Sequence, residues 1–289
     1  MRLDEDVKNW LSQASELLAE KEFAQAEQFI ERALGIKPDH FDALVLFGIV
    51  YVSTNRGQLA TKRCNQMIKT HPDSPGPYRA LSMMIRMTGH IDLGIRHFTS
   101  LMESTTEKGK TYISLCLAEL YCSLGRYGDV KKHLSDGAQS NEFLTMAVLY
   151  QEIGDAAGLE LLLSRIENRA IHLTLQAIVA QIRGNYDKAA QDFYDASEEE
   201  DAPWLAYNAL AGMWLDSGEL ESAKYYLDEA LEIAPNMSEV IVNRARYLRA
   251  CQKNDDAYAL FQQVGEGAGN FAKIRNLAQH YMRQMALGK

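Results

Sequence analysis

The chain has few cysteines, and none is placed as a metal or redox pair would be. The four are Cys64, Cys116, Cys122 and Cys251, and no two have the two-residue spacing typical of zinc sites and redox motifs. No two of the seven histidines stand four residues apart either. We therefore expect buried thiols, no metal site and no cofactor.

Long apolar runs are also missing. No segment offers about 18 uninterrupted apolar residues, the length that a membrane-spanning helix needs. The opening residues, MRLDEDVK, are charged and lack the apolar core of a signal peptide. These absences predict a cytoplasmic protein that does not insert directly into a membrane.

Positive charge is not in excess. The chain has 39 acidic against 30 basic side chains, a formal net charge of −9, which repels phosphate backbones. We therefore expect no nucleic-acid partner. The sequence also shows no nucleophile, base and orienting group that would converge in one pocket. We expect no catalytic residue and a protein that is not an enzyme.

What the chain does have is an internal repeat of about 34 residues. Positions that share this spacing include Ala26 with Ala60, Pro38 with Pro72, Leu44 with Tyr78, Ala189 with Ala223 and Ala257, and Phe193 with Leu227 and Phe261. Glycines stand where one helix would end and the next begin, at Gly89, Gly125, Gly154, Gly184 and Gly218. The pattern predicts antiparallel helix pairs, with small residues where helices touch and glycine in left-handed turns.

These positions resemble the tetratricopeptide repeat family. The copy that matches best carries, in order, Tyr207, Trp214, Gly218, Ala223, Leu227, Ala230 and Pro235. The resemblance covers nearly the whole chain. It implies an all-α fold, an α-solenoid wound as a right-handed superhelix of about eight helix-turn-helix repeats plus a C-terminal capping helix.

We expect four segments along this solenoid. Three regular repeats span 7–108, irregular and shortened repeats span 111–169, three regular repeats span 170–270, and a capping helix spans 271–287. The middle segment is either a hinge between two halves or ordinary drift of the repeat. A flexible joint is expected at 265–270, and the cap is expected to present a polar outer face made of Lys273, Arg275, Gln279, Arg283 and Gln284.

In the tetratricopeptide repeat family, the first helix of each pair lines a concave groove that holds partner segments. The matching positions here include Leu11, Val45, Ile49, Val52, Arg79, Met83, Arg86, Met87, Glu119, Gln151, Glu152, Ile178, Gln181, Asn208, Asp216, Arg246 and Arg249. The first part of this groove is apolar with two arginines, which implies an amphipathic or partly acidic protein or peptide segment as partner. The same apolar stripe could instead be covered by the protein itself, as in a homodimer.

The resemblance implies a non-catalytic scaffold or adaptor that binds a polypeptide in its groove. Such a protein can serve as an assembly factor or chaperone for a multi-subunit complex. An alternative is an accessory or regulatory subunit of an enzyme complex, or a peptide-sensing regulator. The acidic run at 197–201 is either a solvated connection between repeats or a patch for a basic partner.

Overall fold

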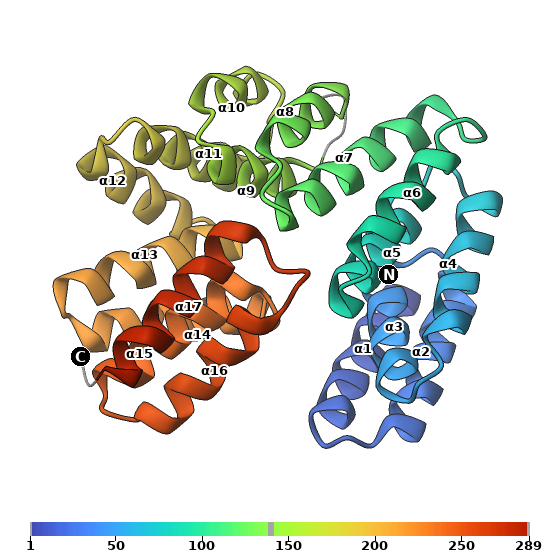
Figure 1. Ribbon diagram of the computed structural model, residues 1–289, viewed down its shortest axis with the longest axis horizontal. Coiled ribbons are helices and arrows are strands. Elements are labelled where there is room, and N and C mark those ends of the chain that lie inside the picture. The colour runs from blue at the N-terminus through green and yellow to red at the C-terminus, as the bar shows by residue number, and fades with distance from the viewer. Residues whose placement is uncertain (1, 138–141, 288–289) are drawn as a thin grey trace. The chain divides into compact units, whose positions relative to one another are not determined.

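A computed structural model describes residues 2–137 and 142–287 of the chain. Within these ranges there are 17 helices and no strand, and the chain forms the predicted all-α solenoid (Figure 1). The helices are α1 (Arg2–Ala19), α2 (Phe23–Ile36), α3 (Phe41–Ser53), α4 (Gly57–Thr70), α5 (Pro75–Thr88), α6 (Ile91–Leu101), α7 (Glu107–Ser123), α8 (Tyr127–Asp136), α9 (Phe143–Ile153), α10 (Ala156–Leu163), α11 (Arg169–Ile182), α12 (Tyr186–Ser197), α13 (Trp204–Ser217), α14 (Leu220–Ile233), α15 (Ser238–Ala250), α16 (Asn254–Glu266) and α17 (Ala272–Ala286). Residues 138–141, which fall within the middle segment expected at 111–169, lie outside the described residues.

The helices follow one another as eight pairs, and α17 stands after the last pair. Each turn within a pair contains one residue with a positive φ angle. Five of these are the glycines predicted from the sequence, and the other three are Lys21, Asn55 and Gln252, with φ of 63°, 59° and 61°. A side chain with a Cβ is disfavoured in this left-handed region, so these three turns carry a conformational cost that the glycine turns do not.

The residues that repeat along the sequence form the core. Every alanine of the period, from Ala26 and Ala60 to Ala223 and Ala257, has no exposed surface. Phe193, at the matching large position, is 1% exposed. Small side chains let the two helices of a pair approach, and the large neighbours fill the space beside them.

Two second helices in the middle of the chain are short. Helix α8 has 10 residues and α10 has 8, whereas α2, α4 and α14 have 14 each. A shorter second helix buries less apolar surface against its neighbours. The prediction that this stretch acts as a hinge remains a prediction.

The chain divides into two compact units. The first unit is Met1–Leu120 with Ser135–Ser140, and the second is Tyr121–Leu134 with Asn141–Lys289. The boundary therefore falls inside the fourth helix pair, near the end of α7. The division into three regular repeats, a middle segment and three further regular repeats remains a prediction.

Two expectations from composition can be compared with the structure. Three of the cysteines are buried as predicted, but Cys251 is only half-buried because it caps the C-terminus of α15. Of the helices described, none combines the length and the apolar character needed to cross a bilayer. The cytoplasmic location remains a prediction.

Candidate functional site

In the first unit, the residues predicted to line a groove differ widely in exposure. Leu11 and Val45 are each only 9% exposed and belong to the core, so they offer little surface to a ligand. Ile49, Val52 and Met83 are half-buried, and Met87 is 45% exposed. The apolar stripe that the sequence suggested is therefore narrower in the structure, because its first members pack against neighbouring helices.

The two arginines of that stripe already have partners within the unit. The Arg79 guanidinium lies over the ring of Phe41, 4.3 Å from its centroid. A guanidinium nitrogen of Arg86 lies 3.6 Å from Oε1 of Glu119. The other carboxylate oxygen of Glu119 accepts a hydrogen bond of 2.8 Å from Ser82. A partner's carboxylate would have to compete with Glu119 for Arg86.

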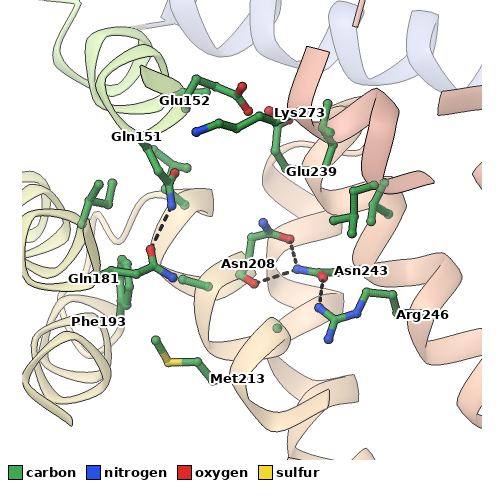
Figure 2. Close-up of a pocket in the computed structure, with 18 of the residues that line it drawn as sticks. Gln151, Glu152, Gln181, Phe193, Asn208, Met213, Glu239, Asn243, Arg246 and Lys273 are labelled. Atoms are coloured by element: carbon green, nitrogen blue, oxygen red, sulfur yellow. Dashed lines mark hydrogen bonds between the residues drawn. The ribbon is translucent and has the colours of Figure 1, made fainter. Parts of the chain in front are cut away.

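The second unit contains a pocket of about 450 Å³ on its concave side (Figure 2). The first helices of four successive pairs line it, and α17 supplies one wall. Seven of the predicted groove residues are brought together here: Gln151, Glu152, Ile178, Gln181, Asn208, Asp216 and Arg246. Arg249 is not, because its guanidinium lies over the ring of Tyr281 and donates a hydrogen bond of 3.3 Å to Gln284.

Side-chain amides form ordered pairs across the pocket wall. Gln151 on α9 donates a hydrogen bond of 2.9 Å to Gln181 on α11. Asn243 on α15 donates to the backbone oxygen and to Oδ1 of Asn208 on α13, at 3.0 and 2.9 Å. Arg246 in turn donates to Oδ1 of Asn243 at 2.9 Å. Each pair joins two neighbouring repeats and holds the amides in position before any ligand binds.

Arg246 also pairs with Asp216, so its charge is balanced within the pocket. Apolar side chains occupy the floor, where Ile178 and Val242 are each 1% exposed and Leu205 is 6% exposed. The pocket thus combines an apolar base with hydrogen-bonding groups at its rim. This is the composition of sites that bind small ligands or short peptide segments.

One end of the pocket holds a carboxyl group in an unusual state. Glu152 at the end of α9 faces Glu239 and Lys273, as Figure 2 shows. Its Oε2 atom is buried and has no hydrogen-bond partner among the described residues. The pKa of Glu152 is raised to about 7, mainly by burial and in addition by the charge of Glu239. The ammonium and the backbone N–H of Lys273 act in the opposite direction.

Helix α17 completes the pocket because its start docks onto the turn between α7 and α8. Ser123 donates a hydrogen bond of 2.8 Å to the carbonyl oxygen of Gly269. Arg275 donates to the carbonyl oxygens of Ser123, Ala268 and Asn270, each at 3.1 Å. These bonds hold α17 against the beginning of the unit.

This docking corrects two expectations for the end of the chain. The segment 265–270 was expected to be a flexible joint, but it is held by Ser123 and Arg275. Lys273 and Arg275 were expected on a solvated outer face. Lys273 is exposed but lines the pocket, whereas Arg275 is half-buried and binds three carbonyl oxygens, because α17 packs against both ends of the unit. Gln279 and Arg283 do lie exposed.

Sequence reasoning missed three polar or charged side chains of the pocket: Asn243, Glu239 and Lys273. Asn243 lies one position beyond the counted groove positions, yet it is a polar side chain that directly follows three apolar ones, Val240, Ile241 and Val242, which are all buried. That interruption of an apolar face was the available signal. No signal pointed to Lys273, since its place depends on how α17 docks.

The comparison with protein families agrees with the helix pairs. A family profile described as Tetratricopeptide repeat matches residues 17–83. Residues 17–83 therefore carry tetratricopeptide repeats. The matched segment runs from α1 to α5, and repeated helix pairs of the same kind continue through α16. Tetratricopeptide repeats are in general interaction modules that bind other proteins on extended concave surfaces.

Several solved structures of tetratricopeptide repeat type have a similar fold. A tetratricopeptide repeat protein from Parabacteroides merdae is 14% identical over 96% of this chain and 98% of its own, with a TM-score of 0.40. The Cut9–Hcn1 hetero-tetramer of the APC/C gives 14% identity, 93% and 55% coverage and a TM-score of 0.47. For pilF of Pseudomonas aeruginosa the values are 12%, 97%, 100% and 0.34. Likeness at this level carries no argument about ligands.

No curated protein matches the chain. In the part of the chain that the structure describes, no group of three or more His, Cys, Asp or Glu side chains is arranged to hold a metal ion.

Proposed function

We propose that this protein is a non-catalytic scaffold that binds a short segment of another polypeptide in the pocket of its second unit. The observation that carries the proposal is the set of ordered amides above an apolar floor. Amide side chains such as Asn208 and Gln181 can donate to and accept from a peptide backbone, whatever its sequence. Apolar groups below them, such as Ile178, can take up the side chains of the bound segment.

The charges of the pocket limit the chemistry of that segment. Glu152, Glu239 and Asp216 stand against Arg246 and Lys273. Asp216 pairs with Arg246, and the other three charged groups, those of Glu152, Glu239 and Lys273, lie at one end of the pocket. We expect an extended segment with apolar side chains and a neutral or basic group at that end.

Gly212 offers a direct way to test this proposal. It lies on the pocket wall, and an added Cβ there would come 3.4 Å from Asn243 and 3.6 Å from Arg246, which is ordinary contact. Gly212→Ala should therefore be tolerated, whereas Gly212→Leu should fill the pocket. Leu161 on α10 is 77% exposed and does not line the pocket, so Leu161→Ala serves as the surface control.

Peptides selected from a random library on the wild-type protein supply the ligands, and isothermal titration measures their affinities. We expect Gly212→Leu and Asn208→Ala to weaken binding by at least about tenfold, because each removes a backbone partner or its space. Gly212→Ala and Leu161→Ala should bind within about threefold of wild type. If all four variants bind alike, or if no peptide is selected, the pocket is not the binding site.

For the first unit, we propose that a carboxylate of an acidic or amphipathic segment displaces Glu119 from its ion pair with Arg86. The variant Glu119→Gln frees Arg86 from its ion pair while keeping the hydrogen bond from Ser82. It should therefore bind an acidic peptide more tightly than wild type does. Equal affinity of the two proteins, measured by titration, would remove this proposal.

The biological role that we propose is that of an assembly factor or chaperone that shields a segment of another subunit. An accessory subunit of an enzyme would instead copurify with that enzyme and change its rate. Light scattering of the purified protein tests the homodimer: a mass near 32.5 kDa identifies a monomer. A doubled mass that persists on dilution would mean that the apolar stripe with Met83 and Met87 is covered by a second copy.

A further inference from the structure

The outer face of two second helices in the second unit carries exposed tyrosines. Tyr186 and Tyr194 on α12 are 64% and 46% exposed, and Tyr225 on α14 is 60% exposed. None of them lines the pocket. A single exposed aromatic ring is common, but several on neighbouring helices leave an apolar area that usually marks a binding surface. We use the name tyrosine face for two segments together. The first is 186–201, which is α12 and the four residues after it, and the second is 220–233, which is α14.

The two helices form one surface at the end of α12. Tyr226 forms a T-shaped ring pair with Tyr225, with centroids 5.1 Å apart. Burial raises the pKa of Tyr226, and the nearby ionisable groups of Tyr194, Glu198, Tyr225 and Tyr207 shift this pKa in the same direction. Residues of α12 and α14 therefore surround the same group.

Tyr207 on α13 lies close to residues of the same two helices. Its hydroxyl donates a hydrogen bond of 3.2 Å to the carbonyl oxygen of Ser197 at the end of α12. Burial raises the pKa of Tyr207, and Glu229, Tyr225 and Glu198 add to this shift. Carboxylates of both helices thus stand beside the tyrosine rings.

The tyrosine face also accounts for the net negative charge of the protein. Its two segments contain 11 aspartates and glutamates against two lysines, so their net charge of −9 equals that of the whole chain, and the remaining residues sum to zero. Both lysines are already engaged, Lys188 with Asp192 and Lys224 with Asp228. Arg169 from α11 pairs with Glu199 and offsets one more charge. The other carboxylates give this face a strongly negative potential.

We propose that the tyrosine face is a second docking surface, which binds a basic, arginine- or lysine-rich segment of a partner protein. Carboxylates bind guanidinium groups with charge-assisted hydrogen bonds, and tyrosine rings stack on the same cations. Tyrosine also makes large contacts at a low cost in conformational entropy. The charge complementarity excludes an acidic segment here, and the surface is independent of the pocket.

The test uses a fluorescent ten-residue peptide of alternating arginine and glycine, with binding followed by anisotropy. The first variant, Glu198→Lys with Glu229→Lys, reverses two charges of the tyrosine face. Its control, Glu20→Lys with Glu103→Lys, makes the same change of net charge at exposed acids of the first unit. The face variant should bind at least about tenfold more weakly and the control within about threefold of wild type.

A second variant separates docking from plain charge attraction. Tyr194→Ser with Tyr225→Ser keeps every charge, and we expect it to weaken binding by about fivefold through loss of the cation–π contacts. Gly212→Leu, which fills the pocket, should bind the peptide normally. Circular dichroism at increasing temperature confirms that each variant is folded. Equal loss in the two charge variants, or full binding by the tyrosine variant, would show that the protein attracts cations without a docking surface.

Discussion

Arg275 donates a hydrogen bond to the carbonyl oxygen of Ser123, 152 residues earlier in the chain. The same guanidinium binds the carbonyl oxygens of Ala268 and Asn270. Hydrogen bonds from a charged group contribute more than neutral ones, and here one side chain holds the start of α17 to the first turn of the second unit.

Replacing Arg275 should therefore destabilise the second unit. We expect Arg275→Ala to lower the free energy of unfolding by about 2 kcal/mol, and Arg275→Lys by less, since lysine keeps the charge but not the fork of donors. Trp204 and Trp214 lie in the second unit and Trp10 in the first. Urea unfolding followed by tryptophan fluorescence in a Trp10→Phe background reports the second unit alone. An unchanged urea midpoint for Arg275→Ala would show that the three hydrogen bonds add nothing to the stability of the second unit.

The stability of the second unit should also depend on the protonation of Glu152. The pKa of this group is about 7 in the folded protein and has a reference value of 4.5. The folded state therefore holds a proton that the unfolded state loses. The resulting stability is present in full below pH 4.5 and is lost as the pH rises to about 7, a change of at most about 3 kcal/mol.

The variant Glu152→Gln isolates this effect. It keeps the shape of the side chain and cannot ionise, so its unfolding free energy should exceed that of wild type at pH 8 and approach it at pH 5. Glu239→Gln removes a charge that raises the pKa of Glu152, and the loss should then occur at lower pH. If the difference between wild type and Glu152→Gln is the same at both pH values, this carboxyl does not titrate as described.

Two glycines at the same helical position predict opposite effects of alanine. Gly76 is the second residue of α5, and a Cβ there would lie 2.1 Å from the carbonyl oxygen of Asp39. Gly128 is the second residue of α8, and a Cβ there would meet nothing within 4 Å. Gly76→Ala should destabilise the protein by about 2 kcal/mol because backbone must move, while Gly128→Ala should stabilise it by about 0.5 kcal/mol. Thermal unfolding measures both effects. Similar shifts in the melting temperatures of the two variants would contradict the close approach at Gly76.

The four thiols should differ in reactivity. Cys64, Cys116 and Cys122 are at most 1% exposed, whereas Cys251 is half-buried at the end of α15. Burial raises the pKa of Cys64 to about 12, so its reactive thiolate is scarce at neutral pH. Iodoacetamide at pH 8 should label Cys251 first, and all four cysteines should react after unfolding. Mass spectrometry of digested protein measures this, and equal labelling of Cys64 and Cys251 in the native state would contradict it.

The sequence predicted the fold because the repeat places the same residue types at the same structural positions. Ala26 and Ala257 are buried for the same reason, and Gly89 and Gly218 make the same left-handed turn. The turns at Lys21 and Gln252 were not predictable in this way, because these residue types indicate no positive φ angle, whereas asparagine, as at Asn55, adopts one more readily. Their conformation is imposed by the helices on either side.

The pocket could be predicted only in part. Gln181, Asn208 and Arg246 follow from the facing of first helices, which the repeat register determines. Lys273 could not be placed, because its position depends on tertiary docking between segments about 150 residues apart. Burial and the nearby Glu239 raise the pKa of Glu152, and no local pattern in the sequence reports this shift.

The bond between Ser123 and Gly269 also determines how the second unit comes apart. In an open row of repeats, the last helix can fray while the middle stays folded, since each repeat touches only its neighbours. Here the last helix is tied to a turn 146 residues earlier, so its release breaks contacts at both ends of the unit. Forming that tie requires the closure of a long loop, which slows folding more than it lowers stability. The second unit should therefore unfold as one cooperative block and refold more slowly than a row of helix pairs held only by nearest neighbours.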